Sequence, residues 1–173
     1  MRRDVLRALV LSAFACAPLM AQAPRPNPRA WSSGGPLIPE QAAFDVTFYD
    51  LELRVSPSDS TIDGALTVFA RATRDLEDLV LDLDTVFTVY AATRARPGAR
   101  NTGRKLSVDR DGGRIRIRLE DRVREGTLVG VRVAYGGRPR IAPRPPWIGG
   151  FQWERTPGGA PWVATSWVNE GGD

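Results

Sequence analysis

Apolar and polar residues alternate with a period of two over most of the chain between residues 44 and 135. In the segment 49–55, YDLELRV, the apolar side chains fall on one face of a β-strand and the charged side chains on the other, so we expect one buried and one solvated face. Comparable segments follow at 62–70, 79–83, 86–92, 105–109, 114–120 and 129–135. None of this region shows a helical period of 3.6 over three turns. A strand about every ten residues predicts an all-β fold, either a β-sandwich or an open curved antiparallel sheet.

Glycine and proline interrupt this pattern at three informative places. Asp111-Gly112-Gly113, between two alternating segments, is a strong hairpin signal. Gly64 occupies an inward-facing strand position, where a bulge or a close backbone approach is expected. The stretch 138–147, RPRIAPRPPW, is interpreted as a rigid connector, with binding to an SH3-like partner as the alternative.

The first 42 residues have a different character. Residues 1–23 begin with Arg2 and Arg3, continue through the apolar run LRALVLSAFACAPLM and end on Ala21-Gln22-Ala23. This arrangement is typical of a secretory signal peptide, and the run is shorter than the ~20 residues of a membrane span. We expect cleavage after Ala21 or after Ala23 and export to the periplasm or beyond, without a transmembrane span. Residues 24–42 are rich in Pro, Gly and Ser and are expected to form an extended linker, which places the folded domain at 43–173.

Composition excludes several classes of chemistry. The chain has no histidine and one cysteine, Cys16, which lies within the predicted signal peptide. We therefore expect no disulfide, no thiolate metal cluster and no histidine-dependent triad or zinc site in these residues. The net charge is +4, and removal of the signal peptide lowers it by two. Because the remaining arginines alternate with acidic residues instead of forming a basic face, we do not expect nucleic-acid binding.

Acidic pairs are the remaining candidates for acid–base or metal chemistry. They are Asp82 with Asp84, Glu120 with Asp121, and Asp109 with Asp111. Two carboxylates two positions apart on a strand share a face and could bind calcium or act as acid and base. We interpret Asp82 and Asp84 as a solvated strand face, because they point away from the neighbouring leucines, and the third pair as turn residues. With no EF-hand loop, phosphate-binding glycine loop or GxSxG motif, the sequence predicts no catalytic residue and no metal ligand here.

The closing stretch 148–173, IGGFQWERTPGGAPWVATSWVNEGGD, holds three of the five tryptophans of the chain: Trp153, Trp162 and Trp167. We interpret Gly149-Gly150 and Gly158-Gly159 as turn glycines between short strands. Large aromatic side chains on short strands need partners that bury them. We therefore expect this chain to be the front portion of a larger protein.

The order of these segments resembles the N-terminal domain of zinc metallopeptidases of the aminopeptidase N family. The segments that carry the resemblance are FDVTFYDLEL at 44–53, TIDG at 61–64, LVLDL at 79–83, VRVAYGGRP at 131–139, GGF at 149–151 and PWVATS at 161–166. Together they span about residues 43–173, and their shared order is more specific than any one of them. The resemblance implies a saddle-like β domain that lies against a catalytic domain, with the chain truncated before that catalytic domain.

The resemblance also implies candidate substrate-binding residues. In the family, the segment after ATS supplies a Glu or Gln that binds the free amino terminus of the peptide substrate. Three residues after Thr165 this chain has Val168, which cannot pair with an ammonium group. Asn169 and Glu170 are the nearest polar side chains and are the candidates for that role. The GxMEN loop and the HExxH zinc helix of the family are expected beyond Asp173, so zinc is expected only if a catalytic domain follows.

Two functions of different classes are consistent with the sequence. The leading hypothesis is the non-catalytic N-terminal domain of an exported zinc-dependent aminopeptidase, which supports the catalytic domain and lines the pocket for the amino terminus of a peptide substrate. The alternative is a free-standing periplasmic β-sandwich that binds peptides or glycans through exposed tryptophans. A structural envelope component is a third class, and it has no specific signal in the sequence.

Overall fold

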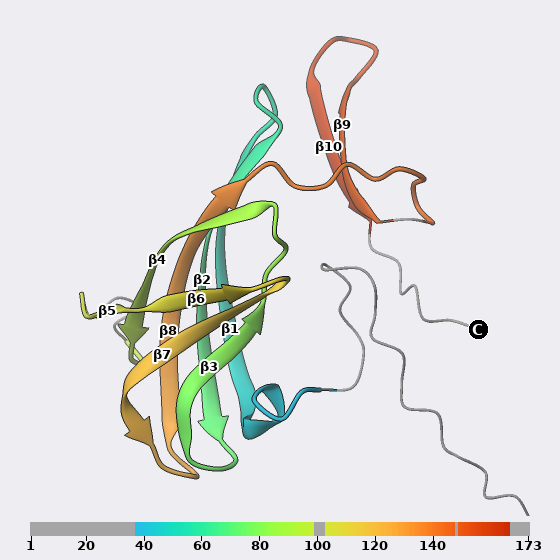
Figure 1. Ribbon diagram of the computed structural model, residues 1–173. Coiled ribbons are helices and arrows are strands. Elements are labelled where there is room, and N and C mark those ends of the chain that lie inside the picture. Colours follow the sequence, from blue (N-terminus) through green and yellow to red (C-terminus); the bar gives the residue numbers. More distant parts are fainter. Residues whose placement is uncertain (1–36, 99–102, 148, 167–173) are drawn as a thin grey trace, which may run out of the picture.

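The computed structural model describes residues 37–98, 103–147 and 149–166, which form one 3₁₀ turn, η1 (Gln41–Ala43), and ten strands (Figure 1). A five-stranded antiparallel sheet has the order β1 (Phe44–Ser56), β2 (Thr61–Ala72), β8 (Leu128–Gly137), β4 (Phe87–Ala95) and β5 (Lys105–Leu106). A three-stranded antiparallel sheet has the order β3 (Leu76–Asp82), β7 (Arg114–Val123) and β6 (Val108–Asp111). The last two strands, β9 (Gly150–Arg155) and β10 (Pro161–Ser166), form a separate hairpin.

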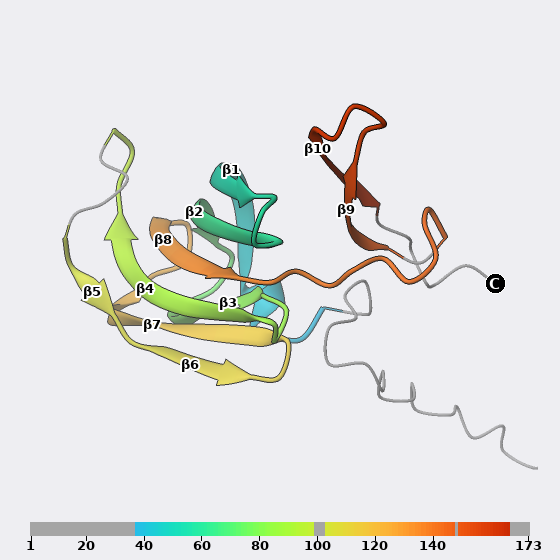
Figure 2. The same cartoon turned by 90° about the horizontal axis from the view of Figure 1, so that it is seen from above.

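The core lies between the two larger sheets. The inward residues Val68 of β2 and Val131 of β8 are fully buried and belong to one cluster with Leu79 of β3 and Ile117 of β7. Figure 2 shows the three-stranded sheet as a layer facing β8 and β4. Because successive side chains of a strand point to opposite faces, the period-two pattern supplies this core from both layers. The all-β prediction is confirmed, with open antiparallel sheets.

The hairpin predicted at residues 111–113 is confirmed, because Gly112 and Gly113 connect β6 to β7 and Gly112 has a φ of 53°. The arm expected at 105–109 is divided, however. Lys105 and Leu106 pair with β4 in the five-stranded sheet, whereas β6 begins at Val108 in the other sheet. Leu106 is buried in the core, so the chain changes sheets at the point where its side chain enters the space between them.

Gly64 allows a close approach, but the approaching group is a side chain. A Cβ atom at Gly64 would lie 2.6 Å from Cζ of Tyr135, the residue opposite it on β8. The other possibility, a bulge, is not found at Gly64, because the register of the β1–β2 pair shifts only between Val46 and Phe48. That irregularity turns Phe48 to the outer face of the sheet, beside Phe69 at a ring-centroid distance of 6.4 Å.

The expectation that the apolar face of residues 49–55 is buried is wrong. Phe44 and Val46, at the start of β1, pack against the core. The four apolar side chains that follow on the same face are substantially exposed: Tyr49 57%, Leu51 54%, Leu53 45% and Val55 39%. The core cluster draws its other residues mainly from β2, β8, β3 and β7, so the three-stranded sheet covers the centre of the larger sheet and leaves the second half of its edge strand uncovered.

The described end of the predicted linker contacts the domain. Gln41 and Ala42 form η1 together with Ala43, and the Gln41 side chain donates a hydrogen bond to Asp82 at 3.0 Å. The Thr73 hydroxyl donates to the Ala42 carbonyl at 3.0 Å. Within residues 37–98, 103–147 and 149–166, no helix has the length and apolar character that a membrane crossing requires.

Candidate functional site

Two of the three tryptophans of the closing stretch, Trp153 and Trp162, lie on the hairpin formed by β9 and β10. Antiparallel pairing sets Trp153 of β9 opposite Val163 of β10, and Trp162 opposite Glu154. The rings of Phe151 and Trp153, two positions apart on one face of β9, stack at 5.4 Å with an interplanar angle of 17°. The hairpin therefore has an aromatic face, made by side chains that alternation places together.

Backbone contacts attach this hairpin to the connector that precedes it. Ile141 forms a parallel bridge with Phe151, whose N–H donates to the Arg140 carbonyl at 2.7 Å and whose carbonyl accepts from the Ala142 N–H at 2.9 Å. Gly150 has a φ of 148°, and a Cβ atom there would lie 2.7 Å from the Ala142 nitrogen. Gly150 is thus a site of close backbone approach rather than the turn glycine that the sequence indicated.

A salt bridge fixes the connector to the body of the domain. The Arg140 guanidinium donates two hydrogen bonds to Asp84, from Nε at 2.6 Å and from Nη2 at 2.9 Å. Burial alone would raise the pKa of Asp84, but hydrogen bonds from Arg140, from the Val86 N–H and from the Thr85 hydroxyl, together with the Arg140 charge, lower it below its ordinary value. The carboxylate is therefore charged at neutral pH and anchors the segment that leads into β9.

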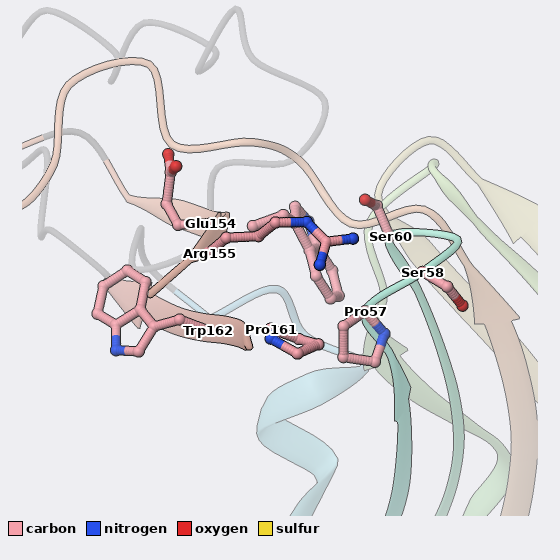
Figure 3. A pocket seen from close by; sticks show the side chains of 8 residues that line it. Pro57, Ser58, Ser60, Glu154, Arg155, Pro161 and Trp162 are labelled. Carbon is pink, nitrogen blue, oxygen red and sulfur yellow. The ribbon is translucent and has the colours of Figure 1, made fainter. Parts of the chain in front are cut away.

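A hollow of about 490 Å³ lies between this hairpin and the turn that joins β1 to β2 (Figure 3). The residues that line it are Pro57, Ser58 and Ser60 of the turn, Trp153, Glu154 and Arg155 of β9, and Pro161 and Trp162 of β10. In Figure 3, Arg155 extends across the hollow toward Ser60, and Pro161 faces Pro57. The sequence of the turn at 56–60 carries no signal that it would face the closing hairpin.

Two of the residues that line the hollow carry polar groups with few partners. Nε1 of Trp153 is buried and has no hydrogen-bond partner in the described parts of the chain, and an unpaired buried donor is costly. Arg155 donates to the Gly159 carbonyl at 2.8 Å across the β9–β10 turn, and within the described ranges no carboxylate forms an ion pair with it. The hollow therefore offers an aromatic surface and a cation, a combination that suits a polar or anionic group carried on an extended chain.

The three acidic pairs do not form a shared site. Asp82 accepts a hydrogen bond from Gln41 at 3.0 Å and lies 3.6 Å from Arg114, whereas Asp84 binds Arg140. Glu120 and Asp121 both lie by Arg104, and Asp109 and Asp111 lie on β6 opposite β7, where Arg116 and Arg114 are their register partners. Each carboxylate thus neighbours arginine rather than a second acidic ligand.

The described part of the chain offers no donor set that fits a zinc ion. The chain has no histidine, its only cysteine is Cys16, and within the described ranges no group of three or more His, Cys, Asp or Glu side chains could hold a metal ion. Trp167, Asn169 and Glu170 lie outside the described residues, so the substrate-binding role of Asn169 and Glu170 stays a prediction.

No protein-family model and no curated protein sequence matches the chain. Solved structures do match its fold. An M1 zinc metallopeptidase from Deinococcus radiodurans matches with a TM-score of 0.51 and 24% identity over 68% of this chain and 27% of that chain. The same values of TM-score and identity are found for a mutant of that enzyme bound to a Tyr-Ser-Ala substrate, over 69% of this chain and 28% of the other. A two-domain M1 zinc metallopeptidase mutant bound to L-tryptophan gives 0.51 and 23% over 69% and 28%.

This likeness concerns the fold. The identities lie below one quarter, and the chain spans little more than a quarter of the length of the metallopeptidases that it matches. The matches accord with the expected open β domain. The fold of this chain is similar to that of part of these two-domain M1 zinc metallopeptidases.

Proposed function

We propose that this chain is the non-catalytic N-terminal part of an exported zinc-dependent aminopeptidase. The observation that supports it most strongly is the fold similarity to M1 zinc metallopeptidases over about two thirds of the chain, together with the ordered segments from FDVTFYDLEL to PWVATS. In this proposal zinc and the catalytic base belong to residues beyond this chain, because the donor set here does not fit the metal. Export rests on the signal-peptide pattern of residues 1–23.

The closing hairpin has a defined place in this proposal. β10 contains the PWVATS segment, and in the proposal the chain that follows it lines the pocket for the amino terminus of a peptide, with Asn169 and Glu170 as candidate contacts. In this proposal the Arg140–Asp84 salt bridge and the backbone bridge at Phe151 fix the position of the hairpin relative to the two larger sheets. A carboxylate placed there would suit the ammonium group of a peptide.

The reading frame beyond codon 173 tests this function directly. We expect it to encode an HExxH motif with a downstream glutamate within the next few hundred codons. The polypeptide so encoded should bind zinc and release amino acids from aminoacyl p-nitroanilides, and a chelator should abolish the release. A stop codon directly after Asp173, with no such motif downstream, would contradict the proposal.

A second candidate function is supported by the hollow between the β1–β2 turn and the hairpin. Its aromatic lining and the Arg155 cation suit binding of a peptide or a glycan by the chain alone. Titration of the 173-residue chain with cello- and chito-oligosaccharides and with tripeptides, followed by tryptophan fluorescence, tests this. Binding should be lost in Trp153→Ala and kept in Trp147→Ala, because Trp147 is 66% exposed in the connector and is not part of the lining. If no ligand changes the fluorescence, this candidate is excluded.

A further inference from the structure

One face of β1 is an apolar surface that the described structure leaves open. Tyr49, Leu51, Leu53 and Val55, here called the β1 stripe, are each 39–57% exposed. Their partners in register on β2 are Val68, Leu66, Gly64 and Ile62, residues of the inner face of the sheet. Ile62 and Val68 are buried, and Leu66 packs against the core. The stripe is therefore a continuation of the core face and not an isolated group of surface residues.

The same strand also forms the edge of the five-stranded sheet. The sheet order begins with β1, and within the described residues no strand pairs with its second side. Between residues 49 and 55 the outward side chains of β1 are charged, and among them Glu52 binds Arg132 at 2.8 Å. A long edge strand with an apolar inner face favours the addition of another strand, because such a strand would satisfy the edge backbone groups and cover the stripe in one step.

We propose that the β1 stripe and the free edge of β1 dock an extended, alternately apolar segment of the remainder of a longer polypeptide to which this chain belongs. This inference rests on the proposed function, since it needs that remainder. The segment would pair with residues 49–55 over about 23 Å, the length of seven residues in a strand, with its apolar residues on the inner face.

Three arguments favour this occupant over a second copy of the chain. The fold neighbours are much longer, since this chain spans 26–28% of their length, so polypeptide for a covering segment is available in proteins of this fold. A seven-residue strand buries less than the ~800 Å² per partner of a stable intermolecular interface, whereas a segment of the same polypeptide acts at an effective concentration near millimolar. A two-fold pairing of β1 that joins Leu51 to Leu53 would also set Glu52 opposite its own copy, and like charges directly opposite are destabilising.

Thiol labelling tests the proposal, because the chain has a single cysteine that can be removed by Cys16→Ser. In that background, Leu53→Cys places a thiol in the stripe. The matched control is Leu128→Cys, because Leu128 has a similar exposure, 40% against 45%, but lies in register with Arg71 on the outer face of the sheet. Maleimide labelling is measured in the 173-residue chain and in the polypeptide encoded by the extended reading frame.

We expect Leu53→Cys to label rapidly in the 173-residue chain and at least about tenfold more slowly in the longer polypeptide, with Leu128→Cys rapid in both. Equal rapid labelling of Leu53→Cys in a longer polypeptide that carries the zinc motif would overturn the docking and leave the proposed function intact. Absence of any longer reading frame would overturn both. Protection of Leu53→Cys in the 173-residue chain, with sedimentation of a dimer, would identify a second copy as the occupant and also overturn the proposal.

Discussion

The two halves of the five-stranded sheet differ in what covers them. Over β2, β8 and β4 the inner face is closed by the three-stranded sheet, and residues such as Val68 and Val131 are fully buried. Over the second half of β1 the same face carries the same kind of residue, yet Leu51 and Leu53 are about half exposed. Alternation in the sequence is equally regular in both places. The difference shows that period two assigns side chains to a face, whereas burial depends on whether another layer reaches that face.

The largest difference in stability is expected between a core residue under the covered part of the sheet and a residue of the uncovered second half of β1. Ile117→Ala removes a side chain that is 0% exposed on β7 and should lower the free energy of unfolding by about 2–5 kcal/mol, because a buried cavity remains. Leu53→Ala in the same chain should cost less than ~1 kcal/mol, because the side chain is already 45% exposed. Urea unfolding followed by far-UV circular dichroism measures both. Equal losses would mean that the stripe is covered in solution.

The second-largest loss of stability is expected from overpacking at Gly130, on the outer face of the sheet where β8 pairs with β2. A Cβ atom at Gly130 would lie 2.6 Å from the Ala95 carbonyl oxygen and 2.6 Å from the Phe69 ring, so Gly130→Ala should cost about 1–3 kcal/mol through overpacking. The control is Gly158→Ala in the β9–β10 turn, where the nearest atom is 4.0 Å away and the change should stay within ~0.5 kcal/mol. The same urea experiment compares them, and a neutral Gly130→Ala would argue against this sheet geometry.

A smaller effect should come from the salt bridge that attaches the hairpin. The lowered pKa of Asp84 means that its contribution is present above the ordinary carboxyl value of 3.8 and is lost as the pH falls through the folded-state pKa below it. Arg140→Gln should cost about 1 kcal/mol at pH 7 and reduce the loss of stability between pH 4 and the acid limit, since the partner charge is gone. Thermal melts across this pH range measure it.

Arg122→Gln is the matched control for the salt bridge, because Arg122 pairs with Asp75 at 3.2 Å in a more exposed setting. Its effect should stay within ~0.5 kcal/mol at every pH. If Arg140→Gln and Arg122→Gln change the melting temperature at low pH by the same amount, the Asp84 salt bridge has no special role in attaching the connector.

The smallest effect is expected from the tryptophans of the separate β9–β10 hairpin. Trp162 is 45% exposed, so Trp162→Ala should change stability by less than ~0.5 kcal/mol and shift the mean emission to shorter wavelength, because a solvated emitter is removed. Trp153→Ala should shift it to longer wavelength, because Trp153 is half-buried and stacked on Phe151. Shifts of the same sign would contradict the two environments.

Much of the fold could be predicted from local pattern, and little of the candidate site could. The hairpin at 111–113 follows from turn chemistry within three residues, and the strands follow from alternation. The hollow depends on Pro57 and Pro161, which are about one hundred positions apart, and on Arg140 reaching Asp84 across 56 positions. Neither pair has a local signal. Asn169 and Glu170, predicted from resemblance, remain predictions because they lie outside the described residues.

The sequence by itself determined the class of the fold and the absence of histidine chemistry, because side-chain alternation and residue type are local properties. Only the tertiary structure decided which apolar faces are covered, since coverage depends on the width and position of a second sheet. It decided that Gly150 is a contact rather than a turn, because that depends on where the connector passes. It also decided that an apolar stripe on β1 remains open, and this open surface carries the proposal of a docked segment.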